Sequence, residues 1–556
     1  MGAEQSGQVR AALDGAEAEG SEGRADATQL WKLDKAREGF RWLLVASPAP
    51  HAFYDANEDY EERERAWHLE VDAGDIDERV DATLRLNAER SSLYVTFIAR
   101  EVWRLSFPTE GEFRAFCAAY QRKLFENTYG VEDSRKNREA VLGADYAGRM
   151  YGEGEAEEMD WDEEEDGASV ASDASLEKQR DGQRAIEKAG SPISLMKMGI
   201  GANSFYMAGP SVSVLRNMEG RVQDKAVSFS LESPSGENIT PVKAILAQGE
   251  KKMNILGKER TSTVYNADIE TGKVVAEWEF QKDGVDVPMK EITTEAKGAQ
   301  ADDRSTFLGL DTNRLCRWDL RDPHGVVQEM TKDAIVEYVG GKDYASGTGT
   351  KFTCMATSGD GSVAVGSADG KIRLYSNNLK LTRAATQLPP LGPGITELDV
   401  SCDGKWVIGT TDQFLVLLKT TSKDPKTGQM VDGFKKSIAP ISARPKLLAL
   451  KPEDAVLLGR KPLRHGRFTF VTESGHQERW IVASCGNYSI LWNFRQAKTS
   501  KGDSTSHGGL QTITKYHLVS QAEDVVDSQF MHENYAADRL GQQSSLVVAT
   551  KNKLLS

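Results

Sequence analysis

One short pattern recurs seven times between about residue 193 and the end of the chain. Each copy has an apolar strand, a small residue, a polar turn and a second strand that ends on an aromatic or aliphatic residue. The clearest copies are FLGLDTNRLCRWDLR (307–321), VAVGSADGKIRLYS (363–376), WVIGTTDQFLVLLKT (406–420) and WIVASCGNYSILWNF (480–494), and weaker copies lie at 203–217, 261–280 and 545–556. One such unit cannot bury both faces of its small sheet, so the copies must pack against one another.

The spacing of the copies indicates a specific architecture. Their anchor residues lie 42 to 75 residues apart and are Val214, Tyr265, Trp318, Tyr375, Leu417, Trp492 and Leu554. Units of this length are typical of four-stranded β-propeller blades, and ring closure removes exposed sheet ends. We therefore predict a mainly β protein with a WD40-like β-propeller of about seven blades over residues 193–556. We expect Trp318, Asp319, Tyr375, Trp406 and Trp492 to be structural anchors of this propeller.

The stretch around Asp369 and Gly370 could in principle be a phosphate loop. That chemistry requires a Gly-rich turn followed by Lys and then Ser or Thr, whereas Lys371 is followed by Ile372 and a strand pattern. Asp-Gly between two apolar runs is instead a strong signal for a tight hairpin turn. We interpret Asp369 and Gly370 as turn residues.

No motif in the sequence indicates an enzyme, a cofactor or a metal site. The five cysteines are scattered without a CxxC pair, which suits free thiols in a reducing compartment. The eight histidines include no HExxH, and His507-Gly-Gly509 has no G-x-S-x-G nucleophile motif to accompany it. His465-Gly466 precedes a strand, where we expect hydrogen bonding within one blade. We predict no enzymatic activity, no cofactor and no small-molecule substrate.

Residues 27–130 have a different texture from the repeats. Strand patterns at 40–46, 66–71, 82–86, 92–98 and 102–107 precede a helical pattern from about Glu110 to Asn127. Thr109 and Glu112 have the spacing of a capping box at its start. Antiparallel strands closed by one C-terminal helix match the order of a pleckstrin-homology-like domain, and a small α+β domain of unknown type is the alternative.

Two segments are predicted to be disordered. Residues 1–26 are small, acidic and Gly-rich, and residues 131–192 include ten acids among the fourteen residues 153–166. The acidic run is a solvated spacer or, alternatively, docks on a basic surface through Trp161. Residues 1–30 and 151–192 carry −4 and −10 of the total charge of −15. The near-neutral remainder argues against a nucleic-acid partner.

The first six residues, MGAEQS, fit the motif for N-myristoylation of Gly2. One acyl chain gives only reversible membrane binding, and the acidic first 30 residues do not add to it. The second signal could come from Lys32, Lys35, Arg37 and Arg41, or these residues could form an ordinary solvated edge.

The blocks STFLGLDTNRLCRWDLRD, TSGDGSVAVGSADGKIRLYS, DGKWVIGTTD, HGRFTFVTESGHQERWIVASCGNYSILWNF and DSQFMHENYA lie between 203 and 550. With them the chain resembles the vacuolar import and degradation family, number twenty-seven in the fungal series, and its plant counterparts. The resemblance implies a WD-repeat-like propeller, a pleckstrin-homology-like N-terminal part and no known catalytic activity. Family members usually add a strand after the Val-Val-Ala-Thr segment, where this chain has only residues 551–556.

Two functional hypotheses follow. The first is a scaffold that binds other proteins through its propeller faces, works in vacuolar import and degradation, and contacts membranes through myristoyl-Gly2 and the N-terminal domain. It implies a cytoplasmic, peripheral-membrane or vesicle-associated protein. The second is a regulatory or nuclear propeller that binds chromatin-associated or nucleic-acid partners through a basic surface patch.

Overall fold

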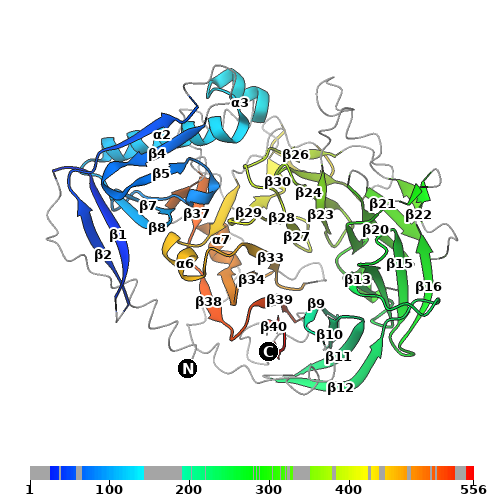
Figure 1. Cartoon of the computed structure of the whole chain (residues 1–556). Coiled ribbons are helices and arrows are strands. Elements are labelled where there is room, and N and C mark those ends of the chain that lie inside the picture. Colours follow the sequence, from blue (N-terminus) through cyan, green and yellow to red (C-terminus); the bar gives the residue numbers. More distant parts are fainter. Residues whose placement is uncertain are drawn as a thin grey trace.

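Seven blades of antiparallel strands stand around a common axis in the computed structural model, and a smaller domain lies against one side of the ring (Figure 1). The structure describes residues 26–36, 39–57, 66–142, 191–201, 203–218, 221–279, 281–282, 285–286, 288–302, 305–312, 315–319, 321, 326–329, 351–377, 384–423, 427–436, 445–471, 478–500, 504–506, 510–531 and 546–555. No described helix is long and apolar enough to cross a membrane.

Each blade begins at the axis and runs outward. Blade 1 has the strands β9 (Ile193–Met198), β10 (Asn203–Ala208), β11 (Ser211–Met218) and β12 (Arg221–Ser230). Blade 2 has β13 (Pro241–Ala247), β14 (Lys252–Gly257), β15 (Thr263–Asp268) and β16 (Lys273–Glu279). Blade 3 has β19 (Glu291–Thr294), β20 (Thr306–Leu310), β21 (Leu315–Asp319) and β22 (Val326–Glu329). A two-stranded hairpin, β17 (Gln281–Lys282) with β18 (Val285–Asp286), joins blades 2 and 3. The 3-10 helix η3 (Ala299–Ala301) follows β19.

The remaining blades follow the same plan. Blade 4 has β23 (Phe352–Thr357), β24 (Val363–Ser367), β25 (Ile372–Tyr375) and β26 (Thr386–Leu388), and blade 5 has β27 (Glu397–Val400), β28 (Trp406–Thr410), β29 (Phe414–Lys419) and β32 (Lys446–Ala449). Blade 6 has β33 (Leu463–Phe468), β34 (Trp480–Cys485), β35 (Tyr488–Asn493) and β38 (His517–Ser520). Blade 7 has β39 (Val525–Phe530), β40 (Leu546–Thr550) and β41 (Leu554–Leu555). The hairpin β30 (Thr421–Lys423) and β31 (Met430–Asp432) lies within blade 5.

The ring closes between blade 7 and blade 1. The innermost strands β39 and β9 are neighbours, and the Ile193 amide donates to the Lys551 carbonyl over 2.8 Å. Gln529 Nε2 also donates to the Met196 carbonyl over 3.1 Å. The prediction of a propeller of about seven blades is confirmed, and the described part of blade 7 has three strands where the others have four.

All seven anchor residues lie on the third strand of their blades, from Val214 on β11 to Leu554 on β41. All of them are buried, and Trp318 and Trp492 are fully so. Asp369 and Gly370 form the turn between β24 and β25, where the Asp369 carboxylate accepts from the Lys371 amide over 3.3 Å. The hairpin interpretation of this stretch is therefore correct.

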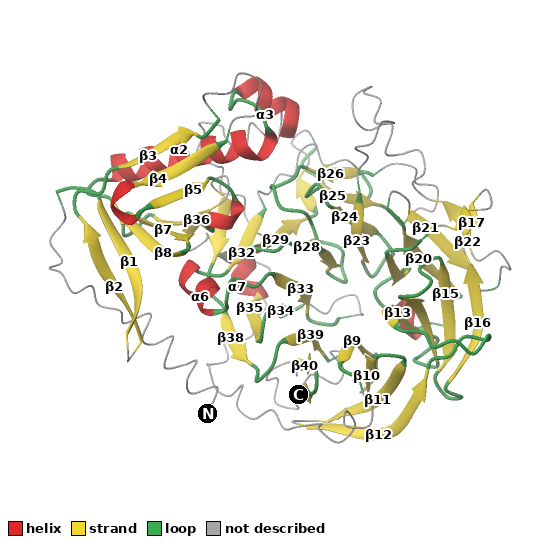
Figure 2. Cartoon of the chain, in the orientation of Figure 1, coloured by secondary structure: helices red, strands yellow, loops and turns green. Residues whose placement is uncertain are grey.

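The N-terminal domain has two sheets and a closing helix (Figure 2). Its strands are β1 (Gln29–Ala36), β2 (Gly39–Ala46), β3 (His51–Asp55), β4 (Trp67–Val71), β5 (Ile76–Arg79), β6 (Asn87–Glu89), β7 (Tyr94–Ala99) and β8 (Glu101–Ser106). The helix α2 (Glu110–Tyr129) packs Phe113, Phe116 and Tyr120 onto them. The Thr109 side chain caps it by accepting from the Glu112 amide over 3.2 Å. The pleckstrin-homology-like kinship of this domain remains a prediction.

Two local predictions need correction. The expected strand at 82–86 is wrong, because Ala82–Leu84 form the 3-10 helix η2. Asp81 accepts from the Thr83 amide over 2.7 Å, and such local bonds compete with strand pairing. The second 3-10 helix, η1 (Asp72–Gly74), follows β4.

The second correction concerns the range 131–192, which was expected to be a disordered linker. The helix α3 (Arg135–Leu142) lies within this range, and residues 143–190 are outside the described residues.

The two domains share one sheet rather than being joined only by a tether. Its strand order is β2-β1-β8-β7-β6-β36-β37-β32-β29-β28-β27, so it runs from the N-terminal domain to the axis of blade 5. The linking strands β36 (Ser504–Ser506) and β37 (Leu510–Ile513) come from an insertion in blade 6 that begins with the helix α7 (Phe494–Thr499). Thr505 pairs with Ala88, and β37 pairs with β32 in parallel.

Candidate functional site: a charge cluster on the propeller axis

Charged residues from six blades meet on the innermost strands. They are Lys197 on β9, Lys243 on β13, Glu291 on β19, Glu397 on β27, His465 and Arg467 on β33, and Asp527 on β39. The side chains of Lys243, Glu397 and Arg467 are 36%, 22% and 27% exposed, although they lie inside the ring. Water therefore reaches this cluster, which we call the axial cluster.

Ion pairs of the axial cluster join neighbouring blades. Lys243 Nζ lies 2.6 Å from Glu291 Oε2, which links blades 2 and 3. Arg467 Nη1 donates to both Asp527 oxygens, over 2.9 and 3.1 Å, and links blades 6 and 7. Such partly enclosed pairs need their hydrogen bonds to offset the cost of desolvation.

His465 links blades 5 and 6. Its amide donates to Glu397 Oε1 over 3.1 Å, and its Nδ1 lies 3.0 Å from Glu397 Oε2. Asp527 Oδ1 of blade 7 lies 3.9 Å from the same nitrogen. The expectation that His465 bonds within its own blade is wrong, because its side chain reaches the carboxylates of the two flanking blades.

The backbone at His465 is irregular, which explains this reach. A β-bulge lies between Arg464 and Arg467, and His465 has a φ of +59°. Gly466 fits tightly beside it, since a Cβ there would lie 2.5 Å from Thr410 Oγ1. Bulges re-aim side chains, and left-handed backbone at a non-glycine residue persists only where the surroundings enforce it.

The electrostatics of the axial cluster follow from its geometry. Burial favours the neutral form of Glu397, but the nearby His465 outweighs burial and holds the pKa of this carboxyl well below its usual range. Burial lowers the pKa of Lys197 to about 8, and the positive charges of Arg467 and Lys243 act in the same direction. Lys197 makes no hydrogen bond or ion pair with any described residue.

The chemistry available to the axial cluster is charge binding. Within the described part of the chain, His465 hydrogen-bonds only to Glu397, so no hydroxyl or thiol nucleophile accompanies it. The described residues also hold no group of three metal-ligating side chains. The cluster thus offers both positive and negative groups along a water-accessible axis.

The residues singled out from the sequence lie away from the axis. Trp318 stacks on Phe307 at 5.6 Å, while Trp406 and Trp492 make edge contacts within the blade 5 and 6 core. Asp319 accepts from Ser305 Oγ over 3.0 Å and pairs with Arg321. The structure therefore gives these residues packing and turn roles, and Gly2 lies outside the described residues.

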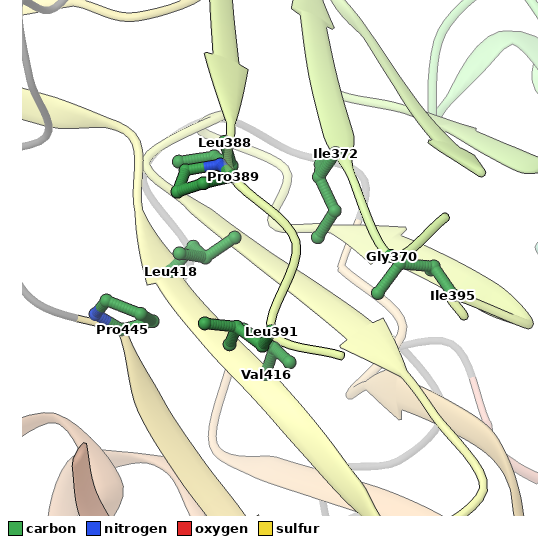
Figure 3. Close-up of a pocket in the computed structure, with 9 residues that line it drawn as sticks. All are labelled: Gly370, Ile372, Leu388, Pro389, Leu391, Ile395, Val416, Leu418 and Pro445. Atoms are coloured by element: carbon green, nitrogen blue, oxygen red, sulfur yellow. The ribbon is translucent and has the colours of Figure 1, made fainter. Parts of the chain in front are cut away.

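The apolar pocket in Figure 3 belongs to the core rather than to the axial cluster. Its lining is Gly370, Ile372, Leu388, Pro389, Leu391, Ile395, Val416, Leu418 and Pro445, none of which has a polar side chain. Most of them are members of the hydrophobic cluster between blades 4 and 5.

Sequence reasoning missed the axial cluster. Its members lie on different repeats and make no local motif. A signal was nevertheless present, because a charged residue occurs 17 to 27 residues before six of the seven anchors, from Lys197 before Val214 to Asp527 before Leu554. Aligning the repeats by their anchors would have placed these residues on the first strands.

Residues 195–555 match the model of the VID27 C-terminal WD40-like domain. The chain belongs to this family. Residues 45–143 match a domain of unknown function, DUF7135. The chain is 30% identical over 338 residues to vacuolar import and degradation protein 27 of Schizosaccharomyces pombe, and 27% identical over 326 residues to the protein of the same name from Saccharomyces cerevisiae.

These alignments cover 59% and 58% of this chain, and 38% of each VID27 relative, so the chain spans well under half the length of those relatives. Among solved structures, the chain is similar to the β-propeller domain of Cps50 (Swd1) from Myceliophteria thermophila. That similarity has 10% identity and a TM-score of 0.43, and covers 66% of this chain and 96% of the other.

Proposed function

We propose that this VID27-family chain is a non-enzymatic scaffold that binds proteins through its propeller faces and serves vacuolar import and degradation of cytosolic proteins. The pathway is that named by its two relatives. A closed ring presents loops on two opposite faces, and its rigid blades hold these loops in place. Loops positioned in this way are suited to bind other proteins. The proposed location is the cytoplasm, with peripheral contact to membranes or vesicles.

The observation that carries the proposal is the sheet shared by the two domains. Ile98 of β7 belongs to one buried cluster with Ala455 and Leu458, which lie in and after the helix α6 (Pro452–Leu457) that precedes β33. Arg460 also donates to the Arg100 carbonyl across the junction. A rigid junction of this kind fixes the spacing between partners bound to the two domains, as a scaffold requires.

The proposed membrane contact rests on the Gly2 motif and on the N-terminal domain. Leu44 and Val45 of the edge strand β2 are 47% and 41% exposed. Among the cations expected to face lipid, however, Lys32 pairs with Glu101, and Arg41 lies 3.8 Å from Asp34. The described part of the hairpin thus offers apolar contact more than positive charge, while Arg37 and the side chain of Lys35 lie outside the described residues. The acyl group would supply most of the affinity.

Proximity labelling from the propeller tests the scaffold role. We expect vesicle and degradation proteins to be labelled by the wild type, and the labelled set to change when Ile98→Asp disrupts the junction. An exposed substitution on the same domain, Ala118→Asp on α2, is the control for the propeller partners. Labelling of nuclear chromatin proteins instead would contradict the proposal and favour the nuclear adaptor.

Membrane fractionation tests the lipid contact separately. A Gly2→Ala variant removes the acylation site, so we expect it to leave the membrane fraction while the propeller partners remain. Unchanged membrane recovery of Gly2→Ala would exclude the lipid anchor without affecting the scaffold role.

A further inference from the structure

We propose that the propeller axis is a binding site for a small oxyanion, a phosphate or a carboxylate group, which is held by Lys197 with Arg467 beside it. The proposal goes beyond the scaffold role, because it assigns a ligand to the interior of the ring. It rests on one unpartnered cation placed among ion pairs that are already complete.

The partners of each axial carboxylate show which axial cation has no acceptor on the protein. Glu291 is paired with Lys243, Asp527 with Arg467, and Glu397 with His465. Asp399 of β27 is likewise paired, with Lys297 at 2.9 Å. Of the axial cations Lys197, Lys243, Lys297, His465 and Arg467, only Lys197 lacks an acceptor among the described residues. An ammonium group has three donors, and none of the three is used by a described acceptor of the protein.

The neighbours of Lys197 favour an anion over another cation or a neutral guest. Arg467 and Lys243 act on Lys197 as like charges, and Glu291 and Asp527, which are paired with those cations, offset this repulsion only in part. Like charges raise the free energy of the charged lysine, and an anion beside it removes that penalty. Arg467 uses Nη1 for Asp527, and its Nη2 has no described partner.

The charge count limits what can bind. Lys197, Lys243 and Arg467 balance Glu291, Glu397 and Asp527, and protonation of His465 adds one positive charge. A ligand that presents a single negative charge therefore fits better than a polyanion. Oxyanions are the natural class, because ammonium and guanidinium groups make short charge-assisted hydrogen bonds to their oxygens.

The backbone gives independent support for a built site. The bulge and the left-handed conformation at His465 place His465 and Arg467 toward the axis on the same strand. Strained backbone of this kind clusters at ligand sites, because regular pairing would be cheaper if packing alone mattered. The strand β33 thus interrupts its regular pairing at the bulge and brings the nitrogen-bearing side chains of His465 and Arg467 to the axis.

The test uses the full chain and titrates phosphate, acetate and chloride at constant ionic strength, with binding followed by calorimetry. We expect saturable binding of phosphate or acetate, and the stronger of the two identifies the ligand group. Loss of one charge-assisted hydrogen bond should weaken binding about ten- to hundredfold in Lys197→Met. Lys197→Arg should retain binding, and Lys258→Met, which alters an exposed lysine of blade 2, should match the wild type.

A labelling experiment on the wild type avoids dependence on the folding of variants. Acylation of lysines near pH 8, read by mass spectrometry, should modify Lys197, and the bound oxyanion should protect Lys197 but not Lys258. Equal effects of chloride, unaltered binding by Lys197→Met in a folded protein, or no protection of Lys197 at saturating oxyanion would each overturn the proposal.

Discussion

Tyr129, the last residue of α2, donates a hydrogen bond of 2.6 Å to the carbonyl of Pro390 in blade 4. The bond spans 261 positions of the sequence and lies outside the shared sheet. The N-terminal domain is thus held to the propeller at a second place, against the blade next to the one that its sheet extends. Two separated attachments resist rotation of the domain, which a single edge pairing would not.

We expect Tyr129→Phe to loosen this second attachment. The Pro390 carbonyl would lose a donor, at a cost of about 1 kcal/mol. Hydrogen exchange should rise in residues 386–391 and at the end of α2. Tyr54→Phe is the control, because Tyr54 donates to Asp77 within its own domain over 2.8 Å. Equal protection in both variants would contradict a docking role for Tyr129.

Gly370→Ala and Gly236→Ala separate backbone strain from steric overlap. Both glycines have left-handed backbone, with φ of +80° and +86°, so each substitution should cost about 1–2 kcal/mol. A Cβ at 370 would also lie 2.7 Å from the Pro393 carbonyl oxygen, whereas nothing lies within 4 Å of one at 236. Denaturant unfolding should show Gly370→Ala to be the less stable; equal stability would contradict the overlap.

Trp318→Ala should be severely destabilising. The side chain is fully buried between β20 and its neighbours, and removing a buried tryptophan costs about 3–5 kcal/mol. Trp278 on the outermost strand β16 is only partly buried. Trp278→Ala should therefore lose clearly less unfolding free energy, and similar losses would show that the third strand is not the tightly packed layer of the blade.

The pH dependence of stability should report on His465. Burial lowers the pKa of His465, but Asp527 and Glu397 outweigh burial, so the net pKa lies above the ordinary 6.5. Its contribution to stability is therefore complete below pH 6.5 and is lost as the pH rises through the folded pKa. Arg467, which lies on the same strand, opposes the shift.

The unfolding free energy of the wild type should fall as the pH rises above 6.5, and His465→Asn should flatten that fall. Glu397 acts in the opposite sense, because its pKa is lowered from 4.5: its contribution is present above pH 4.5 and lost at lower pH. Parallel wild-type and His465→Asn profiles would exclude the proposed coupling of His465 to the carboxylates.

The propeller was predictable because its determinants are local. Asp369 and Gly370 specify a hairpin turn, and Trp318 marks a third strand, without reference to distant residues. The axial cluster is different, since Lys243 and Glu291 meet only because two first strands stand side by side in the ring. The shared sheet was hidden for a similar reason: β36 and β37 lie in an insertion that follows no repeat pattern.

Ring closure has a consequence for how the protein is made. Gln529 bonds to the Met196 carbonyl 333 residues earlier in the chain, and synthesis at about 5–20 residues per second needs roughly 20–70 s to cover that distance. Throughout this interval the first blade of the nascent chain has no neighbour on one side. The emerging polypeptide therefore exposes an unpaired sheet face on the ribosome, where chaperones can bind it.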